Sequence, residues 1–380
     1  MFSIGLGHDL IGILKFGLLI SVTIQYYSKK VKFFEFIGED FPPVHHSTYF
    51  RIGQLCSSAL FPSLRRLSYF LDETSIAHIF LHLSPLLDSL ELFNIKGFEN
   101  TIVGPFLATL SSRMLRQIVL RNGELSLDIL KKSSVHFKQL RSLELSDAII
   151  MNDLVLWEIF GTLPSLENLT LVANNSASRP THAPKNPKTY LEALESLHVT
   201  GSFFLIRYLL RSIDSPWLKS IEIYPVYNRV LNEHGHFTPS MTIVASKWSH
   251  SLKNLVIYSS SSDRDRHSIP DYLIFFKDLH NMEAFRLDWR MQNLEDDLIS
   301  LVTSWPKLRT LNLNQTIVSL STLGLIAKNC PKLCHLHITL DTSIIPPFDI
   351  SIKNLRHNLE DLTVGRAYPS SVSPQNVKLK

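Results

Sequence analysis

One pattern, L-x-x-L-x-L with any aliphatic residue at the leucine positions, recurs about a dozen times along this chain. Successive copies start about 27 residues apart on average. The copies begin at Leu64, Leu87, Leu115, Leu140, Leu166, Leu194, Leu218, Leu252, Met282, Leu308, Leu333 and Leu359, and VKFFEF from Val31 is a candidate for an earlier one. Self-similarity at a fixed spacing predicts a solenoid, in which each unit buries its apolar face by stacking on its neighbours.

Each copy predicts a strand, because alternate leucines in the L-x-L half point to one side of an extended chain. The stretches between copies predict helices, as in 75–83, 153–163 and 298–305, where apolar residues recur at helical spacing. Many strands are preceded by a proline that stops the helix. These phrases are FPSL at Phe61, LPSL at Leu163, SPWL at Ser215, WPKL at Trp305 and CPKL at Cys330. The repeating order of strand, helix and turn predicts an α/β solenoid.

These units resemble leucine-rich repeats, and phrases such as NCPKLCHLHI resemble the cysteine-containing subtype. The repeat sequences LFPSLRRL, LPSLENLTL and WPKLRTLNLN resemble the repeats of fungal F-box-like leucine-rich-repeat proteins. The resemblance covers roughly residues 60–368. It implies a horseshoe of about 12 repeats, with a parallel sheet on the concave face and helices on the convex face.

The chain departs from that family at its start. An F-box opens with L-P-x-E/D-[IVL] and ends in an apolar–C–x–x–W phrase, and neither occurs before residue 60. The stretch YYSKKVKFFEFI resembles the segment that normally follows an F-box. We therefore expect an apolar segment of unknown role at 1–25, a cap or F-box remnant at 26–60, the solenoid at 61–368 and a polar tail at 369–380.

Composition narrows the class of protein. Apolar residues make up 45% and charged residues 19%, which excludes a disordered chain. The net charge of +4 is small, and the basic residues are dispersed, so nucleic-acid binding is not expected. Three cysteines cannot form a disulfide framework and suit a reducing compartment.

The N-terminal segment Leu10–Ile24 is apolar but shorter than the ~20 residues a spanning helix needs. No basic residue precedes it and no small-residue cleavage site follows. A buried or capping helix and a signal peptide or anchor both stay open. Glycosylation triplets begin at Asn168, Asn174 and Asn314, and they would matter only in a secreted chain.

The residues between the leucines should project from the concave face and form a recognition surface. Aromatic and arginine side chains are the usual anchors of protein interfaces. Such residues follow several of the strands, among them Phe70, Phe93, Arg121, Tyr224 and Tyr258, and we predict a partner-binding patch of Glu222, Tyr224, Tyr258, Arg286 and Trp289. Alternatively, these aromatics cover adjacent loops. Three irregular stretches, 174–188, 224–251 and 259–267, are loop insertions that either carry function or are merely tolerated.

Catalytic and metal-binding residues are not expected. The sequence lacks a phosphate-binding loop, H-E-x-x-H, G-x-S-x-G and a dinucleotide fingerprint, and nothing points to a cofactor. The stretch CPKLCHLH at 330–337 holds zinc-ligand types, but its register points Cys330 away from His335 and His337. His234 and His236, in the long insertion, are expected in a solvated loop.

Three functions are favoured, ahead of a distant fourth, an enzymatic or GTPase-activating role. The family resemblance implies the substrate-recognition part of a Skp–cullin–F-box-type ubiquitin ligase, which binds its target on the concave face in the cytoplasm or nucleus. A Skp-type adaptor would join only if an F-box lies upstream of Met1. The alternatives are a stand-alone scaffold or inhibitor with no ligase role, and a secreted or membrane-attached repeat receptor.

Overall fold

The structure, a computed structural model, divides into two compact units, Met1–Leu194 and Glu195–Lys380. The residues that the structure describes are 26–36, 59–71, 76–95, 102–110, 114–123, 127–146, 153–173, 189–226, 234–258, 272–288, 295–340 and 358–366.

The first unit contains a run of parallel strands taken in chain order. They are β1 (Phe33–Phe36), β2 (Arg66–Phe70), β3 (Ser89–Phe93), β4 (Gln117–Arg121), β5 (Ser142–Ser146) and β6 (Asn168–Val172), followed by the short β7 (Thr189–Tyr190). Equivalent repeat positions pair directly, as Glu144 does with Thr170. Strand β1 pairs with β2, so the phrase from Val31 is an earlier copy of the repeat.

Helices connect these strands, because a parallel pair needs a crossover between its members. The described helices of this unit are η1 (Ile76–His82), α3 (Gly104–Thr109), α4 (Leu127–Ser134) and α5 (Asp153–Gly161). The helix predicted at 153–163 is confirmed, with Trp157 and Phe160 buried. The one predicted at 75–83 is a 3₁₀ helix, whose tighter winding suits a crossover of only about two turns.

The second unit repeats the arrangement with its own parallel strands. They are β8 (Ser196–Gly201), β10 (Ser220–Pro225), β11 (Asn254–Tyr258), β12 (Ala284–Asp288), β13 (Thr310–Val318), β14 (His335–Leu340) and β15 (Asp361–Arg366); the short β9 (Ile213–Asp214) lies outside this run. Strand β13 is the longest described strand of this unit. Its pairing with β14 shifts in register between Leu313 and Ile317.

The helices of this unit are α6 (Phe203–Ser212), α7 (His234–Trp248), η4 (Tyr272–Asp278), α8 (Glu295–Ser304) and α9 (Leu320–Asn329). The apolar residues that recur at helical spacing in 298–305 are all buried, namely Leu298, Leu301, Val302 and Trp305. The expectation of a loop at His234 and His236 was wrong, because both residues lie in the first turn of helix α7. The irregular stretch 224–251, predicted as a loop insertion, contains this helix, and Phe237, Met241 and Trp248 of α7 are buried.

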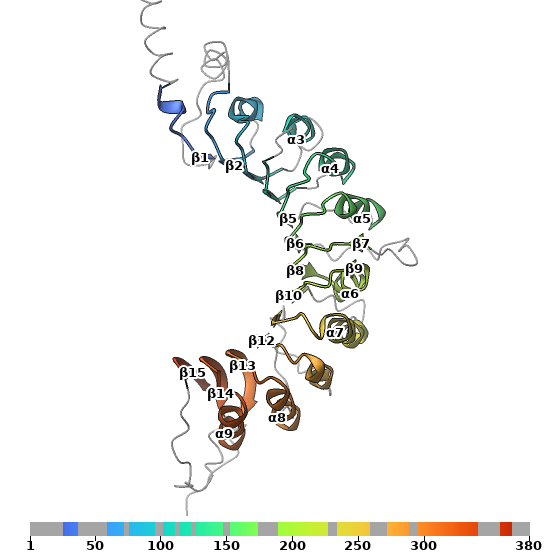
Figure 1. The fold of residues 1–380 in the computed structure, drawn as a ribbon, viewed down its shortest axis with the longest axis vertical. Helices are drawn as coiled ribbons and strands as arrows, with labels where there is room; N and C mark the ends of the chain where they lie inside the picture. The colour runs from blue at the N-terminus through green and yellow to red at the C-terminus, as the bar shows by residue number, and fades with distance from the viewer. Residues whose placement is uncertain are drawn as a thin grey trace, which may run out of the picture. The chain divides into compact units, whose positions relative to one another are not determined.

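The leucine pattern separates two faces of each sheet. From β2 to β14 the apolar residues of L-x-L are almost fully buried, while the residues between them are mostly partly exposed, as in the alternating burial of β10 and β11. The last described strand, β15, differs, because its Leu362 and Val364 are exposed. In each unit the described helices lie on one side of the strands, and the opposite side of the sheet is open (Figure 1). The predicted α/β leucine-rich-repeat solenoid is therefore confirmed.

A shared carbonyl fixes the start of each strand. The amides of Arg141 and Ser142 both donate to the carbonyl of Arg116, at 2.8 and 2.9 Å, and the same arrangement recurs from one copy to the next. Because backbone groups left unpaired in the interior are costly, these bonds hold neighbouring copies in one register. The side chains on the open face are thereby aligned in rows across the strands.

We expect Asn94→Ala to lower the free energy of unfolding by about 1–3 kcal/mol. Asn94 has a φ of 55° and its Nδ2 donates to the Leu71 carbonyl at 2.8 Å, so alanine loses the bond and keeps the unfavourable backbone. Asn94→Gly loses the bond but accepts the backbone, and we expect it to fall between wild type and alanine. Urea denaturation followed by circular dichroism measures the order. Equal stability of alanine and wild type would contradict it.

Candidate functional site

Strands β8, β10, β11 and β12 of the second unit place a row of side chains on the open face. The register sets Glu222 beside His198, Val256 beside Glu222, and Arg286 beside Val256. Two residues further along, Tyr224 and Tyr258 project from the same face of β10 and β11. Each of these positions falls between or after the buried leucines, so the repeat pattern itself directs them outward.

The rings and charges of this row form one continuous stack. Tyr224 and Tyr258 stack with ring centroids 3.9 Å apart and an interplanar angle of 15°. His198 stacks on the other side of Tyr224 at 4.8 Å, and the guanidinium of Arg286 lies 4.6 Å from the Tyr258 ring centre. Aromatic pairs contribute about 0.5–1.5 kcal/mol beyond burial, and cation–π contacts about 0.5–1 kcal/mol at exposed sites. The stack is therefore prearranged.

Polar contacts hold the ends of the stack. The Nδ1 of His198 lies 3.1 Å from Oε2 of Glu222, and its Nε2 lies 3.4 Å from the Thr200 hydroxyl. Burial raises the pKa of the Tyr224 hydroxyl, and its hydrogen bond with Tyr258 raises it further. Tyr224 therefore stays neutral throughout the physiological range.

Four of the five predicted patch residues are thus brought together. Glu222, Tyr224, Tyr258 and Arg286 lie on three adjacent strands, whereas Trp289 lies outside the described residues. The prediction omitted His198, which closes the stack on β8. Its position in the same row as Glu222 was the signal that could have included it, because register alone makes the two residues neighbours.

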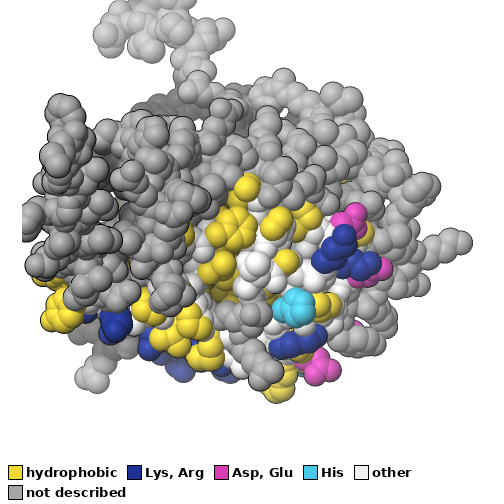
Figure 2. All heavy atoms as spheres, turned by 90° about the horizontal axis from the view of Figure 1, so that it is seen from above, with side chains coloured by type: hydrophobic (Ala, Val, Ile, Leu, Met, Phe, Trp, Pro, Cys, Tyr) yellow, Lys and Arg dark blue, Asp and Glu magenta, His cyan; other side chains and the backbone are white. Residues whose placement is uncertain are grey.

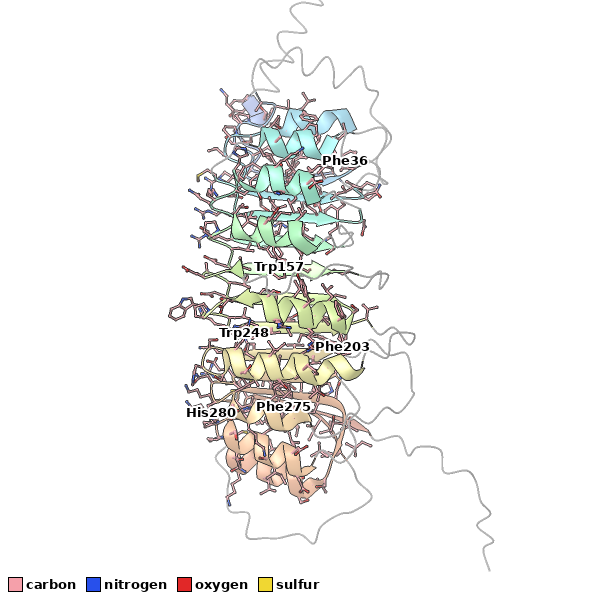
Figure 3. All side chains as sticks on the ribbon, turned by 90° about the vertical axis from the view of Figure 1, so that its right-hand side faces the viewer. Phe36, Trp157, Phe203, Trp248, Phe275 and His280 are labelled. Atoms are coloured by element: carbon pink, nitrogen blue, oxygen red, sulfur yellow. The ribbon has the colours of Figure 1, made fainter. Side chains whose placement is uncertain are left out.

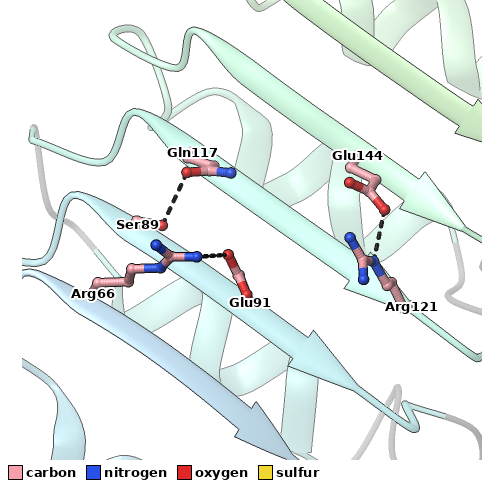
Figure 4. Close-up of polar contacts among 6 residues, drawn as sticks. All are labelled: Arg66, Ser89, Glu91, Gln117, Arg121 and Glu144. Atoms are coloured by element: carbon pink, nitrogen blue, oxygen red, sulfur yellow. Dashed lines mark hydrogen bonds and ion pairs between the residues drawn. The ribbon is translucent and has the colours of Figure 1, made fainter. Parts of the chain in front are cut away.

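The open face of the first unit carries a different pattern, in which charges pair with each other. Arg66 Nη2 contacts Glu91 Oε1 and Arg121 Nε contacts Glu144 Oε1, each at 2.7 Å (Figure 4). The hydrogen bond to Glu144 raises the pKa of Arg121. The guanidinium of Arg121 also lies 5.4 Å from the Phe93 ring centre. Both arginines are therefore neutralised by carboxylates of the neighbouring strand.

Hydrophobic, basic and acidic side chains are interspersed over the described part of one face of the molecule (Figure 2). The described side chains visible in that view form no basic stripe of the kind that tracks a phosphate backbone.

The cysteine and histidine residues near 330–337 point in different directions. Cys330 is buried at the end of α9, where its thiol faces the Val302 carbonyl, while His335 is exposed on β14. Within the described ranges, no three metal-ligating side chains gather closely enough to hold an ion.

We expect Cys330 to resist thiol reagents in the folded protein at pH 8. Burial raises its pKa to about 12, so roughly one molecule in ten thousand carries the reactive thiolate at that pH. Cys334 is partly exposed and should label readily. Mass spectrometry of peptides after timed labelling, with and without urea, distinguishes the two thiols. Equal labelling rates in the absence of urea would contradict the prediction.

Several sequence predictions fall on residues outside the described ranges. These are the apolar segment 10–24, the whole loop at 174–188 with Asn174, and the polar loop at 259–267. Among the helices that the structure does describe, none is long and apolar enough to cross a membrane.

No protein-family model matches the chain, and no curated protein matches its sequence. Among solved structures it is similar to an internalin from Listeria monocytogenes, at 16% identity and a TM-score of 0.43, over 90% of this chain and 89% of that one. It is also similar to TLR13 in a complex with ssRNA13, at 15% identity and a TM-score of 0.40, over 79% of this chain and 37% of that one. A third similarity is to the plant peptide hormone receptor RGFR1 in complex with RGF2, at 14% identity and a TM-score of 0.32.

This third overlap covers 81% of this chain and 49% of the receptor chain. The chain thus spans less than half of the length of the latter two proteins. The assignment of the fold rests on the strand register and burial of this chain itself.

Proposed function

We propose that this chain is a protein-interaction module that binds its partner on the open sheet face of β8 to β12. The observation that carries this proposal is the stack of His198, Tyr224, Tyr258 and Arg286, held ready on a rigid parallel sheet. Aromatic and arginine side chains dominate the binding energy of protein interfaces, and a site that is already ordered loses less entropy on binding.

The finer proposal is that the module recognises substrates for a Skp–cullin–F-box-type ubiquitin ligase in the cytoplasm or nucleus. Its support is the sequence resemblance of the repeats and of the stretch YYSKKVKFFEFI. That stretch runs into β1, so a domain joined ahead of it would be attached directly to the sheet of the first unit. Cys330 and Cys334 are free thiols, which suits a reducing compartment.

The second candidate is a stand-alone scaffold or inhibitor that uses the same face. It is supported by the same stack of His198, Tyr224, Tyr258 and Arg286, which would bind a partner without any ligase. Affinity capture with the full chain from cells, followed by mass spectrometry, distinguishes the two. A Skp-type adaptor and a cullin among the captured proteins support the ligase role, and a partner captured without them supports the scaffold.

A secreted receptor is the least favoured reading. Asn168 lies on β6 and Asn314 on β13, where a glycan would obstruct the open face. The backbone carbonyl of Asn314 accepts a 2.6 Å bond from Thr339 within the sheet. A glycosidase-sensitive loss of mass at either asparagine would revive this reading.

A further inference from the structure

Unpartnered polar atoms gather on strands β12 and β13 at the edge of the stack. Asp288 Oδ1, Asn312 Oδ1 and Asn314 Oδ1 are shielded from water and have no hydrogen-bond partner, and the same is true of Arg286 Nε. Arg286 and Asn312 are register partners, and Asp288 and Asn314 follow each of them by two residues. The four side chains therefore share one face of two adjacent strands.

The one neighbouring cation does not satisfy these acceptors, because the Arg286 guanidinium lies over the Tyr258 ring and its Nε donates to none of them. The open face of the first unit is the contrast, since Arg66 pairs with Glu91, and Arg121 with Glu144. Leaving a shielded acceptor unpaired costs about 1–3 kcal/mol, so three in one place favour a ligand that supplies donors.

The chemical type of these three acceptors indicates which donor group a ligand would supply. One is a carboxylate and two are amide oxygens, which suits a cation with several N–H groups. A guanidinium presents five donors in a fixed plane, and its delocalised charge is more weakly hydrated than that of an ammonium. The adjacent positive charge of Arg286 disfavours a divalent metal ion, whose charge is concentrated at one point.

We propose that Asp288, Asn312 and Asn314 form a subsite for an arginine side chain of the protein partner. The arginine reaches it from an extended segment that lies across β10 to β13 beside Tyr224 and Tyr258. This inference rests on the proposed function and adds to it the chemistry of the partner. Glu222, Arg286 and Asp288 carry one net negative charge between them, which complements a basic side chain.

Random peptides displayed on phage and selected on the immobilised full chain provide the test. We expect arginine to be enriched at one position of the selected peptides, with lysine second. Selection on Asp288→Asn should lose that enrichment, because the substitution removes the charge and preserves the shape. The matched control is Glu144→Gln, which removes a carboxylate from the open face of the first unit and should leave the enrichment unchanged.

A double-mutant cycle with one selected peptide makes the test quantitative. Fluorescence anisotropy should show about tenfold or greater weakening for Asp288→Asn and for replacement of the peptide's arginine by glutamine. The two changes together should weaken binding little further, since each removes the same contact. Asn312→Asp should strengthen binding of the arginine peptide, which keeps the test valid if Asp288→Asn perturbs folding.

The outcomes separate the inference from the proposed function. Peptides that bind the wild-type chain without a basic preference, or that bind Asp288→Asn equally well, overturn the arginine subsite and leave the interaction module standing. An enrichment of acidic residues would reassign the site to Arg286. Failure of the wild-type chain to enrich any peptide would contradict both proposals.

Discussion

Replacing Trp248 by alanine is expected to lower the free energy of unfolding by about 3–5 kcal/mol. Trp248 ends helix α7 with only 1% of its surface exposed, and its Nε1 donates to the Ser215 carbonyl at 2.8 Å. Alanine would leave a large cavity between helix and sheet and a buried carbonyl without its donor. Figure 3 labels Trp157, Phe203 and Trp248, which come from three helices of the layer that covers the sheets.

Trp217 provides the matched control, because it is the same residue type in the same unit with 63% of its surface exposed. We expect Trp217→Ala to change the free energy of unfolding by less than about 0.5 kcal/mol. Guanidinium denaturation followed by circular dichroism compares both variants with the wild type. Similar losses for the two tryptophans would contradict the burial that the fold assigns to α7.

The repeat pattern predicted the fold because its leucines obey two constraints at once. Leu166, Leu169 and Leu171 must face inward, the last two on a strand, and the preceding helix must end before Pro164; both features appear in the structure. The pattern did not predict the type of each crossover. The 3₁₀ helix η1 and the long α7 depend on how much space neighbouring copies leave, which is a property of packing rather than of period.

The repeat pattern also did not predict where asparagines follow the strands. The copy from Leu166 continues as L-x-x-L-x-L-x-x-N, and its asparagine, Asn174, lies outside the described residues. The structure instead shows Asn94 and Asn122 with positive φ directly after β3 and β4. Both stand one place earlier in their copies than Asn174 does in its own, so a template with a fixed offset passes over them. The tolerance of asparagine for a left-handed backbone was the available physical signal.

The sequence predicts which residues lie at the candidate site, but it does not predict the contacts between their side chains. Alternation on a strand places Glu222 and Tyr224 on the open face, and the common register makes their neighbours known. It does not say that Arg286 lies over Tyr258, nor that Asp288 is left without a donor. Those features depend on side-chain torsions, which sequence spacing does not determine. The identity of the partner is absent from the pattern for the same reason.

We expect Tyr258→Ala to weaken binding of the partner about 30-fold or more, corresponding to about 2 kcal/mol. Tyr258 stands between Tyr224 and Arg286 in the stack, so its loss removes one anchor and releases the two beside it. Tyr258→Phe keeps the ring and should stay within a few fold of the wild type. Affinity is measured by titration calorimetry with the partner recovered by capture, and circular dichroism confirms that each variant is folded.

The matched control for this prediction is Phe93→Ala in the first unit. Phe93 also lies beneath a guanidinium, that of Arg121, but this guanidinium is already paired with Glu144. If the partner binds the stack of the second unit, Phe93→Ala should change its affinity less than about threefold. An equal loss for Phe93→Ala and Tyr258→Ala would mean that the stack holds no special share of the binding energy. An unchanged affinity for Tyr258→Ala would remove this patch as the site, because truncation of a central ring cannot be neutral where that ring is an anchor.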